Sequence, residues 1–347
     1  MTVTPPKKST ADTLRDQMSL PLITAPMFLI SNPTLALASC GEGIVGSFPA
    51  LNQLTSAGLD KWLTEMDDGI ADLKAKNPTA KIAPYAVNLI VHKSNPRLEA
   101  DLALIVKHKV PIVITSLGAV SDLVEAVHSY GGIVLHDVTN IDHAKKAIAA
   151  GVDGLIAVSA GAGGHAGTMN PLTLVHQLRE FYDGTIVLAG GMTTGQDVLA
   201  AEAMGADFAY MGTRFICTKE SSADPAYKQM IMDAKASDII YTSAISGVPA
   251  NFLKNSLEAA GFDVEKLKKE GGNSSKLKPI TDEAAAWKTI WSAGQGAVNI
   301  DDVPSVKELV DRLKQEHQDA EQKLVARHPV KAATPVVPPK RPPAPKM

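Results

Sequence analysis

Eight short apolar runs are spaced along the chain, and segments with the spacing of amphipathic helices separate many of them. Within each run the apolar residues are continuous rather than alternating, which is typical of parallel strands buried on both faces. Eight such strands with intervening helices predict a (β/α)8 barrel, and a doubly wound parallel sheet is the second possibility. The predicted strands are Leu22–Pro26, Gly43–Gly46, Pro84–Leu89, Ile112–Thr115, Ile133–His136, Gly154–Val158, Ile186–Ala189 and Phe208–Met211.

The pattern divides the chain into five segments. Residues 1–16 are polar and patternless, so we expect a flexible N-terminus, and residues 17–223 form the barrel. Residues 224–290 do not continue the repeat and are expected to form a helical cap over the barrel. Residues 291–325 hold a late turn and a last helix near Val306–Leu324, and the Pro- and Lys-rich residues 326–347 predict a disordered tail. The clearest earlier helices are Leu98–Lys107, Val120–Ser129, Ile141–Ala150 and Gly195–Met204.

Composition narrows the class of protein and its compartment. The 347 residues are 45% hydrophobic with a formal net charge of -3. That length suffices for one large barrel with an appended segment, and the near-neutral charge gives no reason to expect a nucleic-acid or membrane partner. No apolar run approaches the length of a membrane span. Cys40 and Cys217 form no CxxC pair or metal cluster, so we expect a reducing compartment, the cytoplasm.

The segment after the sixth predicted strand combines glycines with a histidine. It reads SAGAGGHAGT from Ser159 to Thr168, with His165 among four glycines. In a (β/α)8 barrel, ligands contact the loops that follow the carboxyl ends of the strands. Glycine lets the backbone approach a flat ring or a phosphate, and histidine exchanges protons near neutral pH. His165 is therefore the candidate catalytic residue.

Small-residue turns also follow the seventh and eighth predicted strands. Gly190–Met192 comes after the seventh and Met211–Arg214 includes the turn after the eighth. Barrels frequently hold a phosphate at these two loops. The chain has no P-loop, HExxH pattern or nucleophile elbow to support a kinase or a hydrolase. The sequence therefore predicts a phosphate-bearing cofactor.

Polar side chains lie at the ends of three earlier strands. Asn88 closes the third predicted strand, and Thr115 and Ser116 close the fourth. These residues offer hydrogen-bonding groups where the rim of a bound ring would lie. His136 ends the fifth strand, where it either faces the ligand or is a hydrogen-bonded core histidine.

Six segments of the chain resemble the nitronate monooxygenase family, FMN-dependent (β/α)8 barrels formerly called 2-nitropropane dioxygenases. The matching segments run in order from about Pro21 to Leu324, so only the two tails lie outside the resemblance. They are ITAPM (Ile23–Met27), VNL (Val87–Leu89), VDGLIAVSAGAGGHAG (Val152–Gly167), VLAGGM (Val187–Met192), MGTRF (Met211–Phe215) and SAGQG (Ser292–Gly296).

The resemblance implies FMN as the cofactor. The isoalloxazine ring would lie along Ala25–Met27, with Asn88 near its pyrimidine edge, and the two late glycine turns would hold the phosphate. His165 would be the base toward neutral nitroalkanes, or would orient the nitro group. The cofactor-binding residues expected on this basis are Ala25, Pro26, Met27, Asn88, Thr115, His136, Asp153, Gly163, Gly164, Gly190, Gly191, Met211, Gly212, Thr213, Ser292 and Gln295.

The activity that the resemblance implies is oxidative denitrification of alkyl nitronates, and of nitroalkanes, by O2 to carbonyl compounds and nitrite. The expected partners are a small nitro compound and O2, and the protein would be a monomer or a homodimer. Two alternatives stay open. One is an NAD(P)H-dependent reductase of the same superfamily, acting on a quinone or an enoyl-acyl-carrier protein. Some relatives carry a Lys where His136-Asp137 follows the fifth strand of this chain. The other is a flavin-binding protein without turnover.

Overall fold

Eight parallel strands form the centre of the molecule. In the computed structural model the described residues are 8–92, 94–118, 121–245, 247–270 and 290–327. The barrel strands are β1 (Leu22–Thr24), β2 (Gly46–Pro49), β3 (Tyr85–Ile90), β4 (Ile112–Ser116), β5 (Ile133–Val138), β6 (Gly154–Val158), β8 (Thr185–Ala189) and β9 (Phe208–Met211). Their order is β1-β9-β8-β6-β5-β4-β3-β2. A bridge between Ile23 and Val45 joins β1 to the residue before β2, and the predicted barrel is confirmed.

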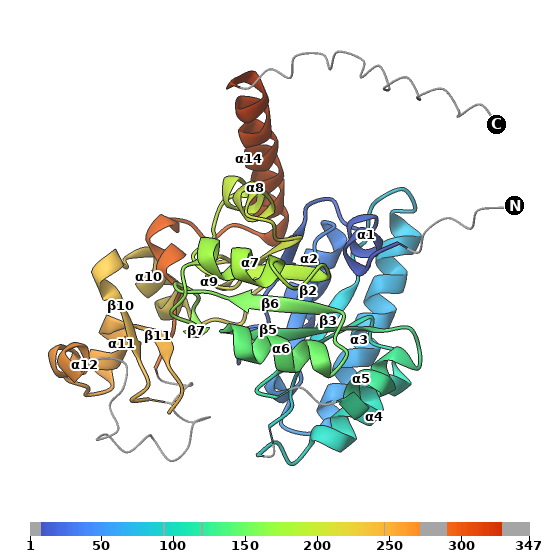
Figure 1. The fold of residues 1–347 in the computed structure, drawn as a ribbon, viewed down its shortest axis with the longest axis horizontal. Helices are drawn as coiled ribbons and strands as arrows, with labels where there is room; N and C mark the ends of the chain where they lie inside the picture. Colours follow the sequence, from blue (N-terminus) through green and yellow to red (C-terminus); the bar gives the residue numbers. More distant parts are fainter. Residues whose placement is uncertain (1–7, 93, 119–120, 246, 271–289, 328–347) are drawn as a thin grey trace, which may run out of the picture.

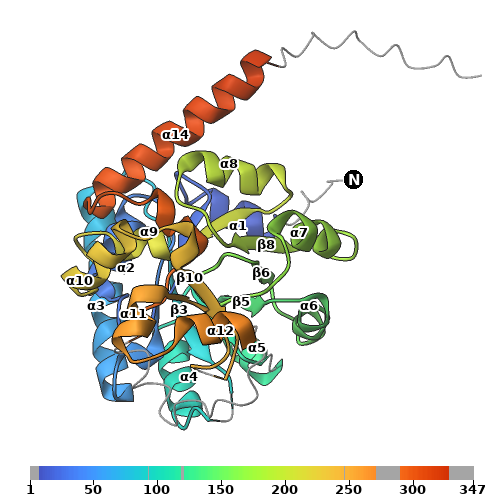
Figure 2. The same ribbon diagram turned by 90° about the vertical axis from the view of Figure 1, so that its left-hand side faces the viewer.

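Helices surround these strands, as Figure 2 shows. They are α2 (Pro33–Gly41), α3 (Ser56–Lys76), α4 (Leu98–Lys107), α5 (Ser121–His128), α6 (Ile141–Ala149), α7 (Pro171–Arg179), α8 (Gly195–Ala203) and α14 (Val306–Arg327). Several begin where a polar side chain after a strand caps the first turn: Asn140 caps α6, and Thr194 forms a capping box with Asp197 at α8. The end of α14 extends beyond the barrel (Figures 1 and 2).

Alternate residues of each strand face the barrel interior and the helices. One buried cluster unites Ile114, Leu135 and Ile156 with residues of α1 (Thr10–Arg15), so these side chains point into the barrel. A second cluster unites strand residues such as Val113 and Val134 with buried side chains of the surrounding helices. Because side chains alternate along a strand, this pattern fixes the direction of every polar residue at the strand ends.

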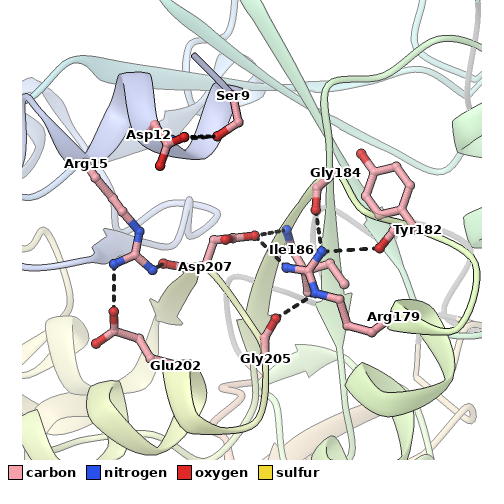
Figure 3. Close-up of polar contacts among 10 residues, drawn as sticks. All are labelled: Ser9, Asp12, Arg15, Arg179, Tyr182, Gly184, Ile186, Glu202, Gly205 and Asp207. Atoms are coloured by element: carbon pink, nitrogen blue, oxygen red, sulfur yellow. Dashed lines mark hydrogen bonds and ion pairs between the residues drawn. The ribbon is translucent and has the colours of Figure 1, made fainter. Parts of the chain in front are cut away.

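The amino end of the barrel is closed by α1, which corrects the expectation of a flexible segment through residue 16. Leu14 is 1% exposed and belongs to the interior cluster, and Ser9 caps the helix. Arg15 binds Glu202 at 2.7 Å. The Asp207 carboxylate accepts hydrogen bonds from Arg179 at 2.7 Å and from the Ile186 N–H of β8 at 2.8 Å (Figure 3). The burial of Leu14 explains why a short polar segment is ordered here.

A cap follows the barrel and lies at the opposite end from α1 (Figure 1). It contains two strands that the sequence analysis did not predict. These strands form an antiparallel sheet, in the order β10-β11-β7, with two residues of the loop after β6. The cap elements are α10 (Pro225–Met232), η2 (Ala236–Asp238), β10 (Ile239–Thr242), β11 (Ala250–Leu253), α11 (Lys254–Ala259) and α12 (Val264–Glu270). The other short elements of the described chain are η1 (Ala50–Asn52), β7 (Gly164–His165), α9 (Thr213–Ile216) and η3 (Gln295–Asn299).

Element boundaries agree closely with the sequence predictions except at β2. This strand begins at Gly46 rather than at Gly43, because the Gly43 carbonyl is used in a turn contact with the Ser19 N–H at 2.8 Å. The predicted tail, residues 326–347, lies outside the described residues from 328 onward, whereas residues 326 and 327 are helical and belong to α14. The later part of the cap, 271–289, also lies outside the described residues. Among the described residues, no helix combines the length and apolar character needed to span a membrane.

Candidate active site

The loops after β1 and β9 lie side by side at the carboxyl end of the barrel. The Ala25 N–H donates to the Met211 carbonyl at 2.9 Å. A Cβ on Gly212 would lie 3.5 Å from the Ala25 Cβ and 3.7 Å from the Met27 sulfur. Ala25–Met27 and Gly212 therefore form one continuous surface, as expected if both contact the same ligand.

The glycine loop after β6 is in close contact with the turn at 292–296. The Gln295 N–H donates to the Gly161 carbonyl at 2.8 Å, and the Gly294 N–H donates to the Thr213 hydroxyl at 2.9 Å. A Cβ on Gly163 would lie 2.7 Å from the Gly294 nitrogen, so a larger residue at 163 requires the backbone to move. The turn thus joins the loops after β6 and β9.

The turn that contains the predicted residues Ser292 and Gln295 is fixed by contacts with Tyr227 of α10. The Ser292 carbonyl accepts a hydrogen bond from the Tyr227 hydroxyl, and the Tyr227 ring stacks on Trp291 with centroids 4.9 Å apart. The Gln295 side-chain oxygen would be 3.0 Å from a Cβ on Gly161. Both side chains therefore lie at the glycine loop, and their contact with a flavin stays a prediction.

His165 lies in β7, and the cap positions this strand. Gly164 pairs with Asn251 and His165 pairs with Ala250 in β11. The buried Asn251 amide donates to the Ala162 carbonyl at 2.7 Å. A flexible glycine segment thus gains a fixed direction from an antiparallel partner, and His165 is half-buried beside the glycine loop.

The turn after β8 leaves space next to its backbone. Gly191 has a φ of +72°, and a Cβ there would meet no heavy atom within 4 Å. Nearby in the chain, the buried Thr193 hydroxyl has no hydrogen-bond partner among the described residues. A buried polar atom without a partner is costly, so either an ordered water or a ligand group would satisfy this hydroxyl.

A polar network crosses the inner face of three neighbouring strands. The Asn88 amide donates to the Ser116 hydroxyl at 2.8 Å, and this hydroxyl donates to the Asp137 carboxylate at 2.5 Å. The other carboxylate oxygen, Oδ1, is buried with no partner among the described residues. Burial raises the pKa of Asp137 to about 6, although the Ser116 hydrogen bond opposes this shift. Asp137 was not among the predicted site residues.

Three predicted cofactor-binding residues lie elsewhere. Thr115 and His136 alternate with the inward residues and so face the helix layer, where the Thr115 hydroxyl contacts the His136 ring at 2.7 Å. Burial lowers the pKa of His136 to about 4. Asp153 precedes β6 at the amino end of the barrel, where its carboxylate accepts a hydrogen bond from the Val134 N–H at 2.8 Å. The core-histidine alternative is the one that describes the environment of His136.

The remaining residues of the MGTRF segment are structural. The Met211 side chain belongs to the helix-facing cluster, and only its backbone faces the Ala25 loop. Arg214 is 3% exposed and binds the Asp302 carboxylate at 2.8 Å, which fastens α9 to the segment before α14. No group of three or more metal-ligating side chains occurs among the described residues.

A cavity of about 360 Å³ lies at the other end of the barrel. Its lining includes Leu14 of α1, Tyr85 at the start of β3 and Lys74 of α3. It is therefore separated from the glycine loops by the packed interior of the barrel. Active sites of this fold lie at the carboxyl end, and the glycine loops remain the candidate site.

Comparison with known proteins identifies a family for most of the chain. A sequence model of the nitronate monooxygenase family matches residues 12–316. The nitronate monooxygenase of Paraburkholderia phytofirmans is 29% identical over 284 residues, which cover 70% of this chain and 76% of that relative.

Two solved structures share the fold over nearly the whole chain. Nitroalkane oxidase from Streptomyces ansochromogenes has a TM-score of 0.74 at 26% identity, with 91% of this chain and 100% of that chain covered. FabK from Thermotoga maritima has a TM-score of 0.74 at 24% identity, with 92% and 99% covered, and this second likeness concerns the fold alone.

Proposed function

The chain belongs to the nitronate monooxygenase family, and on that premise we propose that it uses FMN and O2 to oxidise alkyl nitronates, and nitroalkanes, to carbonyl compounds and nitrite. Family membership makes the protein an oxidoreductase and implies a flavin cofactor. The proposal keeps a small nitro compound as the substrate, the cytoplasm as the location, and a monomer or a homodimer as the assembly.

The residues at the carboxyl end of the barrel fit an FMN molecule. The open space beside Gly191 suits a phosphate group, and so does the Thr193 hydroxyl, which has no partner among the described residues. Ala25–Met27 and Gly212 offer an unobstructed surface for a flat ring, and Asn88 offers an amide at its polar edge. Gly163 and Gly164 would border the ring because they lie in the adjoining loop. When bound, FMN supplies the electron transfer between the substrate and O2.

His165 supplies the proton chemistry in this proposal. A neutral imidazole accepts the acidic α-proton of a nitroalkane, whereas a nitronate arrives without that proton. Toward a nitronate, a ring N–H of His165 would donate a hydrogen bond to a nitro oxygen. The observation that supports this role best is the pairing of β7 with β11, since it holds an imidazole beside the glycine loops. The direction of a general base is what determines its effectiveness.

Substitution of the histidine tests the proposal. We expect His165→Ala to bind FMN and to lose at least about a hundredfold in kcat/KM for a neutral nitroalkane, the usual effect of removing a general base. The loss should be smaller for the corresponding nitronate. Nitrite release in air measures both. His176→Ala is the matched control, because His176 is an exposed residue of α7 with its side chain 80% exposed.

Normal nitroalkane turnover by FMN-loaded His165→Ala would contradict the assignment. An equal loss with nitroalkane and nitronate would assign to His165 the orientation of the nitro group rather than the removal of the proton.

A further inference from the structure

Asp137 is a carboxylate on the inner face of the barrel that the proposed reaction does not use. It follows Leu135 by two residues in β5, and Leu135 belongs to the interior cluster. Ser116 stands in the same relation to Ile114 in β4. The carboxylate therefore lies with Asn88 at the end of the barrel where we propose that the flavin binds.

One oxygen of this carboxylate is satisfied and the other is not. Oδ2 accepts a hydrogen bond from Ser116, which itself accepts one from Asn88, so the side chain is fixed in direction. Oδ1 is buried and lacks a partner among the described residues. A carboxylate oxygen in this position either accepts a hydrogen bond from a ligand or takes up a proton.

The groups that face Asp137 leave its charge uncompensated. On β4 the facing residue is Ser116, and on β6 the inward residues are Ile156 and Val158, which are apolar. Tyr210 of β9 is the titratable group that interacts with Asp137, and burial raises the pKa of this phenol well above its usual value, so it stays neutral. His165 lies in the loop after β6, at the same end of the barrel. Among the described residues, no Lys or Arg contributes to the pKa of this carboxylate.

We propose that Asp137 is the protein group that takes up a proton when the bound flavin is reduced. The inference rests on the proposed cofactor site. Two-electron reduction with uptake of one proton leaves one negative charge on an isoalloxazine ring. An ionised carboxylate at the same end of a low-dielectric barrel opposes that charge. A second proton from solvent, added to Asp137, removes the repulsion, so two electrons and two protons enter together.

The expected window follows from the direction of each shift. In the flavin-free protein the pKa of Asp137 is raised to about 6 by burial. Below that pH the group is already protonated and reduction adds no proton to it. A reduced, negatively charged ring would raise the pKa of Asp137 further. Between pH 6 and that higher pKa, reduction of the flavin adds a proton to Asp137. Asp137 therefore makes the flavin harder to reduce at high pH than it would be beside a neutral residue.

Potentiometric titration of the FMN-loaded protein against pH tests this inference without any substrate. Each proton taken up with two electrons adds about 30 mV per pH unit to the slope of the reduction potential. We expect a slope of about 60 mV per pH unit above pH 6 in the native protein, and about 30 in Asp137→Asn, provided that the ring itself takes up one proton. The variant should also have the higher potential at pH 8, and the two curves should converge below pH 6.

Two further variants distinguish proton uptake from a structural effect. Asp142→Asn removes an exposed acid from α6 and should leave the slope unchanged. Ser116→Ala removes the hydrogen bond that lowers the pKa of Asp137, so the break in the curve should move to higher pH. In addition, reduction should produce the infrared carbonyl band of a protonated carboxyl in the native protein, and Asp137→Asn should lack it.

The outcomes separate this inference from the proposed function. If FMN binds but the native protein and Asp137→Asn give the same potential curve, the inference is overturned and the cofactor site stands. If the native protein binds no FMN, both are overturned.

Discussion

His136 and Asp137 are neighbours in the chain, yet burial affects them in opposite ways because they lie on opposite faces of β5. Burial disfavours the charged form of each group, so the pKa of His136 falls to about 4 and that of Asp137 rises to about 6. The histidine faces the helix layer, with the Thr115 hydroxyl as its partner. The carboxylate faces the barrel interior. His136 is therefore part of the packing between β5 and the helices, and Asp137 belongs to the candidate site.

Acid sensitivity should reveal the buried histidine. Its pKa is about 4 in the fold against 6.5 in an unfolded chain, so the unfolded state binds the extra proton and stability is lost as pH falls from 6.5 to 4. The difference amounts to about 2 to 3 kcal/mol at pH 4.5. His136→Asn keeps a hydrogen-bonding group for Thr115. Between pH 7 and pH 4.5, its free energy of unfolding should fall by about 2 to 3 kcal/mol less than that of the native protein. Urea unfolding at the two pH values measures it.

The same variant examines the expectation that His136 contacts FMN. If the helix-facing position is correct, His136→Asn binds FMN with an unchanged Kd. A tenfold higher Kd for FMN in His136→Asn would show that His136 belongs to the cofactor site.

At these positions the sequence predicts the presence of a polar residue but not its direction. The apolar run Ile133–Leu135 comes directly before His136 and Asp137, so no alternation of polar and apolar residues marks which side chains face inward. The direction follows only from packing, which unites Leu135 with the interior cluster. This explains why His136 was expected at the cofactor while Asp137 was not. Asp153 was expected there through the family segment, although it precedes its strand.

Among the elements, the turn after β8 shows how backbone conformation creates a binding surface. The φ of +72° at Gly191 is in the left-handed region, which a side chain disfavours by about 1 to 2 kcal/mol. The space beside it is open. Gly131, at the other end of the barrel, has a φ of +85° and equally open surroundings. The two glycines thus share a conformation and differ in their distance from the candidate site.

This pair of glycines separates strain from ligand contact. Gly191→Ala and Gly131→Ala should each lower the free energy of unfolding by about 1 to 2 kcal/mol. Only Gly191→Ala should weaken FMN binding, by tenfold or more, because its methyl group occupies the space proposed for the phosphate. Calorimetric titration of the flavin-free proteins measures the difference. Equal affinities in the two variants would remove the turn after β8 from the site.

The barrel strands other than β2 and the helices named from the sequence were predicted within a few residues, whereas β7, β10 and β11 were not predicted. The helix Leu98–Lys107 has enough periodic residues to be identified from its own sequence. By contrast, β7 is two residues long and exists because β11, from a distant part of the chain, pairs with it. Gly163 and Gly164 were predicted at the flavin, but the antiparallel sheet that directs His165 required the tertiary structure.

In the whole molecule, stability and chemistry are assigned to opposite ends of one barrel. At the amino end, α1 fills the interior, and Arg15 and Arg179 make fixed contacts with Glu202 and Asp207 (Figure 3). At the carboxyl end lie the glycine turns, the Thr193 hydroxyl and the Asp137 Oδ1, and these two buried atoms have no partner among the described residues. Groups left unsatisfied reduce the stability of the free protein, and a ligand that satisfies them restores it.

Anaerobic reduction of the bound flavin tests the central claim most directly. FMN-loaded protein is mixed without O2 with an alkyl nitronate and, separately, with NADH or NADPH, and the flavin absorbance is followed. We expect the nitronate to bleach the flavin on the time scale of turnover and neither nicotinamide to do so. Rapid bleaching by NADH or NADPH, with no reduction by the nitronate, would contradict it and identify a reductase.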